Sequence, residues 1–226
     1  MRDVLPPEVI ELIGSQYFNS IREAEPGFRN YQADEDAITG ALGSSMDRMV
    51  KGSYGAGGSL YTWKTRTVKL RGRGPGAPEK EYGADAILEL EVCDGIGNTI
   101  GRKVLPFQAK KAGRINSQSL YDQSRRLNSL PGGGLVVVFG PEGYECTSAK
   151  EVLVVDGSWG QVQPGQRQGF AKVVQTRFLE CTVGSRSLYF DAERERMVML
   201  EEDGTSRDIR FTVRRRTRTT IRHIGY

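Results

Sequence analysis

The run LVVVFG at residues 135–140 constrains the fold more than any other segment of the chain. Six consecutive residues without a polar side chain, preceded by PGGG, fit a strand that is covered on both faces. The segment just before it, 117–130, has apolar residues at helical spacing, and a helix there would cover one of those faces. The sequence therefore predicts an α/β or α+β fold with a mixed central sheet flanked by helices.

Other segments supply the rest of that sheet. Helical periodicity predicts helices over 6–27, 33–50 and 170–181, the second with Asp34 as its N-cap and the third ended by Gly184. Strands are expected at 59–70, 84–93, 103–110 and 142–149, and a hairpin around Asp203–Gly204. The Gly-rich segment 51–59 is predicted to be a turn, and 71–83 a mobile basic loop.

At 226 residues, the chain suits one domain with an extension. We expect residues 1–156 to hold the N-terminal helices and the core sheet. Residues 157–226 would form a helix, a β-hairpin and a basic tail packed on that core. The N-terminus does not resemble a signal peptide, and no apolar run reaches the roughly 20 residues of a membrane helix, so a cytoplasmic protein without a membrane partner is expected.

Histidine and cysteine chemistry is disfavoured by the composition. The only histidine, His223, lies among arginines near the C-terminus, and the three cysteines are far apart without any C-x-x-C pair. This argues against a Ser-His-Asp triad, a zinc cluster and a disulfide framework. Catalysis would therefore fall to carboxylates, amides, Lys and Arg.

The positive charge is unevenly distributed. The formal net charge is only +4, but Lys and Arg cluster at 66–74, 110–114 and 214–223. Such clusters indicate a polyanionic partner, with solvated surface as the alternative. The candidate nucleic-acid contacts are Arg71, Arg73, Lys111, Arg114, Arg214, Arg215, Arg216 and Arg218.

Two expected strands bring polar residues together at one end. If 86–93 and 103–109 pair antiparallel about a turn at Ile96–Gly97, Asp85 lies opposite Gln108. Lys110 shares the face of Gln108, whereas Ala109 points the other way. Pro106 makes an irregularity in this pairing plausible. A carboxylate, an amide and an ammonium group would then meet at one edge of the sheet.

This arrangement resembles the PD-(D/E)XK nuclease superfamily, which has the restriction-endonuclease-like fold. There, an Asp at a strand start is followed by a hairpin return that ends in Glu-x-Lys or, in a minority of members, Gln-x-Lys. The matching residues are Asp85, Gln108 and Lys110, and a helix and a buried strand follow here as in the family. The resemblance covers roughly residues 31–156. It departs from the family pattern at Ala84, where a proline is common, and at Gln108, which lacks the usual charge.

The resemblance implies a metal-dependent DNA endonuclease, of the kind that serves in restriction or antiviral defence. Asp85, Gln108, Lys110 and a helix carboxylate would be catalytic; Glu35 is our choice for that carboxylate, with Asp34 and Asp36 as open alternatives. Mg²⁺ or Mn²⁺ would be held by oxygens of Asp85, Gln108, Ala109 and Glu35, with Lys110 orienting the attacking water.

DNA is the expected partner, together with a second copy of the chain or a regulatory protein. The alternatives are a non-catalytic nucleic-acid-binding or scaffold protein with a decayed site, and an RNA-directed nuclease. Each residue alone has an ordinary structural interpretation, because an Asp at a strand edge often belongs to a turn and a Lys after a strand is usually solvated.

Overall fold

The computed structural model describes residues 1–226 except 32–33, 71, 73, 75–76, 201–205 and 210–226. Its main element is a seven-stranded mixed sheet in the order β1-β2-β3-β4-β5-β6-β7, in which only β4 and β5 are parallel. The predicted fold class is therefore confirmed. The strands are β1 (Lys51–Ala56), β2 (Ser59–Lys69), β3 (Ala86–Asp94), β4 (Thr99–Lys111), β5 (Leu135–Gly140), β6 (Gly143–Ser148) and β7 (Gln168–Gly169).

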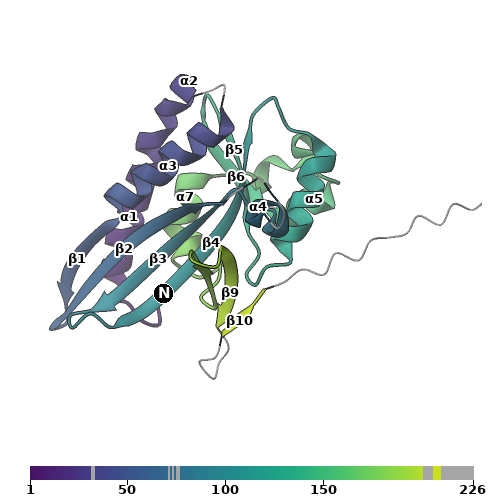
Figure 1. Ribbon diagram of the computed structural model, residues 1–226. Helices are drawn as coiled ribbons and strands as arrows, with labels where there is room; N and C mark the ends of the chain where they lie inside the picture. The colour runs from purple at the N-terminus through teal and green to yellow at the C-terminus, as the bar shows by residue number, and fades with distance from the viewer. Residues whose placement is uncertain (32–33, 71, 73, 75–76, 201–205, 210–226) are drawn as a thin grey trace, which may run out of the picture.

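Helices cover both faces of this sheet (Figure 1). The helices are α1 (Pro7–Ala24), α2 (Phe28–Tyr31), α3 (Glu35–Met49), α4 (Pro78–Tyr82), α5 (Ser117–Asn128), α6 (Ala149–Val154) and α7 (Phe170–Val173), which a π-helical turn over Val174–Phe178 continues. Helices α1, α3 and α7 pack in the larger core, whereas α4, α5 and α6 pack against the opposite face. Among the described residues, no helix is long and apolar enough to cross a membrane.

Strand β4 lies at the centre of the sheet and separates the two cores. Leu105, Phe107 and Ala109 belong to the core on the α1 and α3 side, while Val104 belongs to the core on the α4 and α5 side. Helix α5 makes the crossover from β4 to its parallel neighbour β5, and every residue of β5 before Gly140 is buried. The prediction of a strand buried on both faces is correct for this reason.

The β3–β4 pairing has the predicted register. Ala86 is paired with Phe107, so Asp85 stands opposite Gln108. The irregularity is a shift between Val92 and Cys93, and the expectation of one at Pro106 is wrong. Pro106 lies between the backbone bridge from Val104 to Ser185 and the start of the β4–β5 pairing at Phe107, a position where no neighbouring strand requires its missing N–H.

A second, three-stranded sheet follows near the C-terminus, made of β8 (Leu188–Asp191), β9 (Arg196–Leu200) and β10 (Ser206–Asp208). The β9–β10 pairing matches the hairpin predicted around Asp203–Gly204, whose turn lies outside the described residues. Leu188, Phe190 and Met197 pack in the core beneath α4 and α5, so this segment covers part of the main sheet.

Three local predictions are wrong. The Gly-rich segment 51–59 is a strand and a tight turn rather than a turn throughout, because β1 pairs with β2 over six residues. The segment 71–83, predicted to be a loop, contains α4, whose Pro78 and Tyr82 are buried. The last predicted helix stops before Cys181, an exposed residue with a φ of 63°.

Candidate active site

The end of β4 carries the polar constellation. The Gln108 side-chain amide donates from Nε2 to the Asp85 carboxylate at Oδ2, and the Ala109 N–H donates to the same oxygen at 2.8 Å. Gln108 Nε2 also lies 3.2 Å from the Ala109 carbonyl oxygen. Asp85, Gln108 and Ala109 are thus brought within hydrogen-bonding distance across 23 and 24 residues of sequence.

A second carboxylate joins them from the first turn of α3. Glu35 Oε1 lies 3.3 Å from the Lys110 ammonium nitrogen, and Glu35 Oε2 accepts the Lys111 N–H at 2.8 Å. The Lys110 side chain is only 13% exposed and that of Glu35 34% exposed, so this ion pair is partly shielded from water. Among the three neighbouring acids, Glu35 is the one that reaches the candidate site.

The two flanking acids have other partners. Asp34 is the N-cap of α3, as predicted, and its Oδ1 accepts the N–H groups of Asp36 and Ala37 at 2.9 and 3.3 Å. Asp36 lies at the surface, where its carboxylate is 3.2 Å from the Lys69 ammonium nitrogen. The cap fixes the first turn of α3 and thereby directs Glu35 toward β4.

Both carboxylates also complete the hydrogen bonding of the edge of β4. The Ala112 N–H bonds to Phe139 of β5, so alternate N–H groups of β4, those of Ala109 and Lys111, face the β3 side. Strand β3 begins at Ala86 and provides no strand partner for them there. Asp85 and Glu35 accept these two N–H groups instead, which accounts for acids at these positions on structural grounds.

Burial at this edge disfavours the charged forms of two carboxyl groups, those of Asp85 and Glu79. Burial raises the pKa of Asp85 to about 6. The Lys110 ammonium and the Ala109 N–H lower this pKa, whereas the negative charges of Glu79 and Glu35 raise it further. Burial also raises the pKa of Glu79, against the charge of Lys110. Ionisation of Asp85 is therefore costly unless positive charge is added nearby.

The orientation of the Gln108 amide follows from Asp85. An ionised carboxylate can only accept hydrogen bonds, so the amide must turn its NH₂ group toward it. The whole of Gln108 is 0% exposed, and the other end of its amide, Oε1, has no hydrogen-bond donor among the described residues. An unpartnered buried carbonyl oxygen is a free ligand position for a donor or a cation.

The donors at this edge suit a hard cation in type. A carboxylate, an amide oxygen and a backbone carbonyl oxygen are oxygen ligands of the kind that Mg²⁺ and Mn²⁺ accept, and Mg²⁺ keeps several waters. No group of three Asp, Glu, His or Cys side chains among the described residues converges as a ready metal cluster. The oxygens of Asp85, Gln108 and Ala109 therefore fit such a cation in type, but Asp85 and Gln108 Oε1 can face it together only if the Gln108 amide turns over, because Nε2 is the end that faces Asp85.

Sequence reasoning missed Glu79. It lies in α4, within a segment predicted to be a loop, and its charge acts on both Asp85 and Lys110. The signal that could have found it was Pro78, because proline at the first helical position followed by acidic residues is typical of a helix start.

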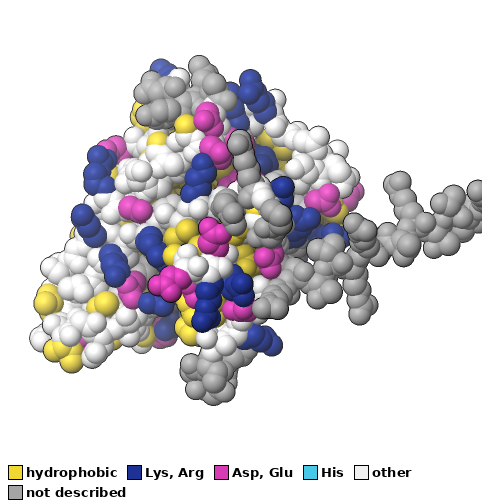
Figure 2. All heavy atoms as spheres, viewed as in Figure 1, with side chains coloured by type: hydrophobic (Ala, Val, Ile, Leu, Met, Phe, Trp, Pro, Cys, Tyr) yellow, Lys and Arg dark blue, Asp and Glu magenta, His cyan; other side chains and the backbone are white. Residues whose placement is uncertain are grey.

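The predicted nucleic-acid contacts are only partly described. Lys111 is half-buried beside the site and Arg114 is exposed in the turn after β4. On the face shown in Figure 2, Lys and Arg alternate with Asp and Glu rather than forming one continuous basic surface. The remaining six predicted contacts, Arg71, Arg73, Arg214, Arg215, Arg216 and Arg218, lie outside the described residues.

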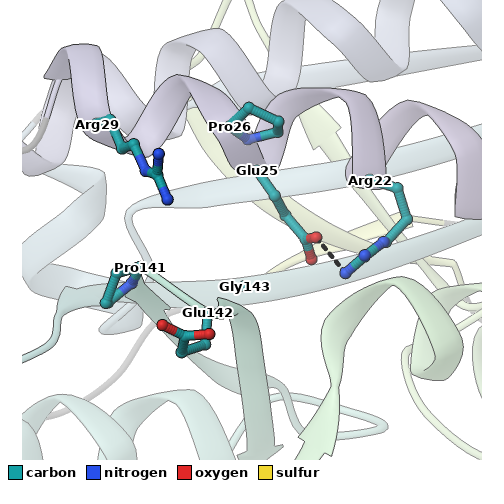
Figure 3. Close-up of a pocket in the computed structure, with 7 residues that line it drawn as sticks. All are labelled: Arg22, Glu25, Pro26, Arg29, Pro141, Glu142 and Gly143. Atoms are coloured by element: carbon teal, nitrogen blue, oxygen red, sulfur yellow. Dashed lines mark hydrogen bonds and ion pairs between the residues drawn. The ribbon is translucent and has the colours of Figure 1, made fainter.

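A hollow of about 380 Å³ opens at the same end of the sheet, between the end of α1 and the β5–β6 turn (Figure 3). Because β4 and β5 are parallel, Pro141 follows β5 on the side where Lys111 ends β4. Arg29 extends into this space, while Arg22 is paired with Glu25. The lining of the hollow carries two positive side chains, Arg22 and Arg29, and two negative ones, Glu25 and Glu142. These charges balance, so the hollow by itself gives no reason to expect an anion.

Comparisons with known proteins do not assign the chain. No family model, no curated protein and no solved structure matches it.

Proposed function

We propose that this protein is a metal-dependent endonuclease that hydrolyses phosphodiester bonds in DNA. The observation that carries the proposal lies at the end of β4. Asp85 contacts Gln108 there, and Lys110, two residues further along the same strand, contacts Glu35. This is the order and geometry that the resemblance to the PD-(D/E)XK superfamily implies. A role as a restriction or antiviral-defence effector in the cytoplasm, where such an enzyme meets DNA, belongs to the same proposal.

The residues divide the chemistry among them. Asp85, Gln108 and Ala109 would hold the cation, which neutralises charge on the scissile phosphate and lowers the pKa of water. Lys110, whose charge acts on Asp85, would hydrogen-bond a phosphate oxygen or orient the attacking water. Glu35 holds the Lys110 ammonium in position through the 3.3 Å ion pair. Hydrolysis adds water across the P–O bond, and the leaving oxygen takes up a proton.

The test is cleavage of supercoiled and linear plasmid DNA with Mg²⁺ or Mn²⁺. Asp85→Asn and Lys110→Met should each lower the rate at least about 100-fold, since each removes a group that acts on the reacting phosphate. Asp122→Asn on α5 and Lys150→Met on α6 are matched controls with the same charge changes, and they should cleave as the wild type does. Equal rates in all five proteins would contradict the assignment.

A second candidate is a non-catalytic nucleic-acid-binding protein with a decayed site. Its supporting observation is that Gln108 donates to Asp85, so the pair is satisfied by hydrogen bonding without a metal. Salt-sensitive DNA binding with no cleavage at any metal concentration would favour it. Faster cleavage of RNA than of DNA of the same sequence would instead favour an RNA-directed nuclease.

A further inference from the structure

Strand β1 is an open edge of the main sheet. It is the first strand in the sheet order, it pairs only with β2 among the described residues, and its residues from Lys51 to Gly55 are all exposed. Figure 1 shows it at the outer border of the sheet. The opposite edge is β7, which has only two residues and is too short to offer a row of backbone groups to another strand.

Alternate backbone groups of β1 point away from β2. The Thr65 N–H donates to the Val50 carbonyl oxygen at 2.9 Å, so the even-numbered residues of this antiparallel pair are the ones that bond to β2. The outward-facing residues are Lys51, Ser53 and Gly55. Of their backbone groups, only the Lys51 carbonyl oxygen has a partner in the described part of the chain, the Gln16 side-chain amide at 3.4 Å.

The same side of the sheet is closed beyond β1. Where β2 continues past the end of β1, the Thr67 N–H donates to the Asp47 carboxylate of α3 at 2.6 Å. The open edge is thus confined to β1, whose only charged residue is Lys51. An edge strand with exposed backbone groups and little charge is suited to pairing with a further strand.

We propose that β1 is the docking surface for β1 of a second copy of this chain, which pairs with it antiparallel about a two-fold axis at Ser53. This axis places Ser53 opposite its own copy and Lys51 opposite Gly55 of the second copy. Because all of these residues face outward, each opposed pair is of the kind that exchanges both N–H···O bonds, and the two sheets become one. The inference does not depend on the proposed function.

On the α1 side of the sheet, the side chains of the two copies fit in size. Opposed residues share a face, so Tyr54 of one copy, which is 43% exposed, lies over Gly52 of the other. Gly52 is paired with Trp63 of β2, whose side chain lies 3.0 Å from the place of a Cβ on Gly52. Because Gly52 has no side chain, the Tyr54 ring of the second copy can rest over it beside Trp63.

On the other side of the sheet, Lys51 of one copy lies over Gly55 of the other. Gly55 is paired with Leu60 of β2, which is 47% exposed, and the aliphatic stem of Lys51 can cover it. The two Lys51 side chains are kept apart, because each stands opposite a glycine at its own end of the paired segment. Both large residues of β1 thus meet a glycine in this register.

Sedimentation velocity of the metal-free protein without DNA, at concentrations up to about 0.5 mM, tests the pairing. The paired segment is smaller than a standard interface of about 20–30 residues a side, so the dimer should form in a concentration-dependent way. The mass should rise from the 25.1 kDa of one chain towards twice that value.

Two variants test the register. Ser53→Lys should raise the Kd of the dimer at least about tenfold, because two ammonium groups would face each other at the axis. Ser119→Lys, the same change at an exposed position of α5, should dimerise as the wild type does. Tyr54→Thr keeps a residue that favours strands but removes the ring from both copies, and it should raise the Kd about tenfold. Thermal unfolding of each variant in dilute solution checks that it folds.

Amide hydrogen exchange identifies the edge that pairs. Exchange at the outward-facing N–H groups of Ser53 and Gly55 should slow when the protein is concentrated. The N–H groups of Gly52 and Tyr54 bond to β2 already in the monomer, so their exchange should not change.

Three outcomes would overturn the inference. The first is a monomer at every concentration, and the second is a dimer that Ser53→Lys leaves intact, since another surface would then form it. The third is assembly beyond a dimer, because pairing about the two-fold axis leaves no β1 edge free. Plasmid cleavage tests the proposed function separately from all three.

Discussion

Asp85→Asn should stabilise the metal-free protein at neutral and alkaline pH. The asparagine side chain keeps an oxygen that can accept from Gln108 and the Ala109 N–H, but it carries no charge to bury. In the wild type, burial raises the pKa of Asp85 from 3.8 to about 6. The unfolded chain, in which that pKa is ordinary, is thus favoured by ionisation.

The sign and size of the effect follow from proton linkage. The folded state binds the Asp85 proton more tightly, so the stability that this group contributes is fully present below about pH 4 and is lost as pH rises through about 6. A difference of about two pKa units corresponds to about 3 kcal/mol above pH 7, and to only about 0.6 kcal/mol at pH 4. For a chain of this length, about 3 kcal/mol is a rise in Tm of about 6–12 °C.

Urea unfolding of both proteins in EDTA, at several pH values between 4 and 8, measures this directly. The gain in unfolding free energy of the variant should increase between pH 4 and pH 6 and stay constant above pH 7. Asp122→Asn, a matched change on α5, should show no such pH dependence. A variant that is less stable than the wild type by the same amount at every pH would refute the reasoning, because Asp85 would then be a favourable ion in the folded state.

Three further results are expected. Gln108→Glu should destabilise the metal-free protein at pH 8 by about 2–3 kcal/mol, since two buried carboxylates would face each other, and Mg²⁺ should restore the loss in thermal unfolding. Gly83→Ala should lower the unfolding free energy by more than about 2 kcal/mol, because both its φ and the Gln123 backbone oxygen exclude a Cβ; a change below about 0.5 kcal/mol in urea unfolding would contradict this. Asp34→Ala should cost about 1 kcal/mol through loss of the α3 N-cap, measured by urea unfolding, whereas Asp36→Ala, which removes only a surface ion pair, should cost less.

The strand pairing at the site was predictable because it depends on local rules. Side chains alternate along a strand and the turn fixes the register, so the position of Asp85 opposite Gln108 follows from the residue numbers alone. The Asp34 cap is similarly local, since the capping oxygen and the N–H groups it accepts lie within three residues. The roles proposed for these residues in catalysis remain predictions.

Strand β1 and helix α4 were not predictable in the same way. Glycine has little preference for strands, and β1 exists because β2 offers it a complete hydrogen-bonding edge. Helix α4 is five residues long, too short for periodicity to show, and it depends on burial of Pro78 and Tyr82 against the rest of the protein.

The sequence by itself determined the mixed sheet, the doubly covered β5 and the gathering of an acid, an amide and a base at the end of β4, because each depends on side-chain periodicity along adjacent segments. Only the tertiary structure decided which helix acid meets Lys110, that Glu79 lies close by, and how costly the charge on Asp85 is. Those properties depend on packing between segments tens of residues apart and on the water that this packing excludes, which no local pattern records.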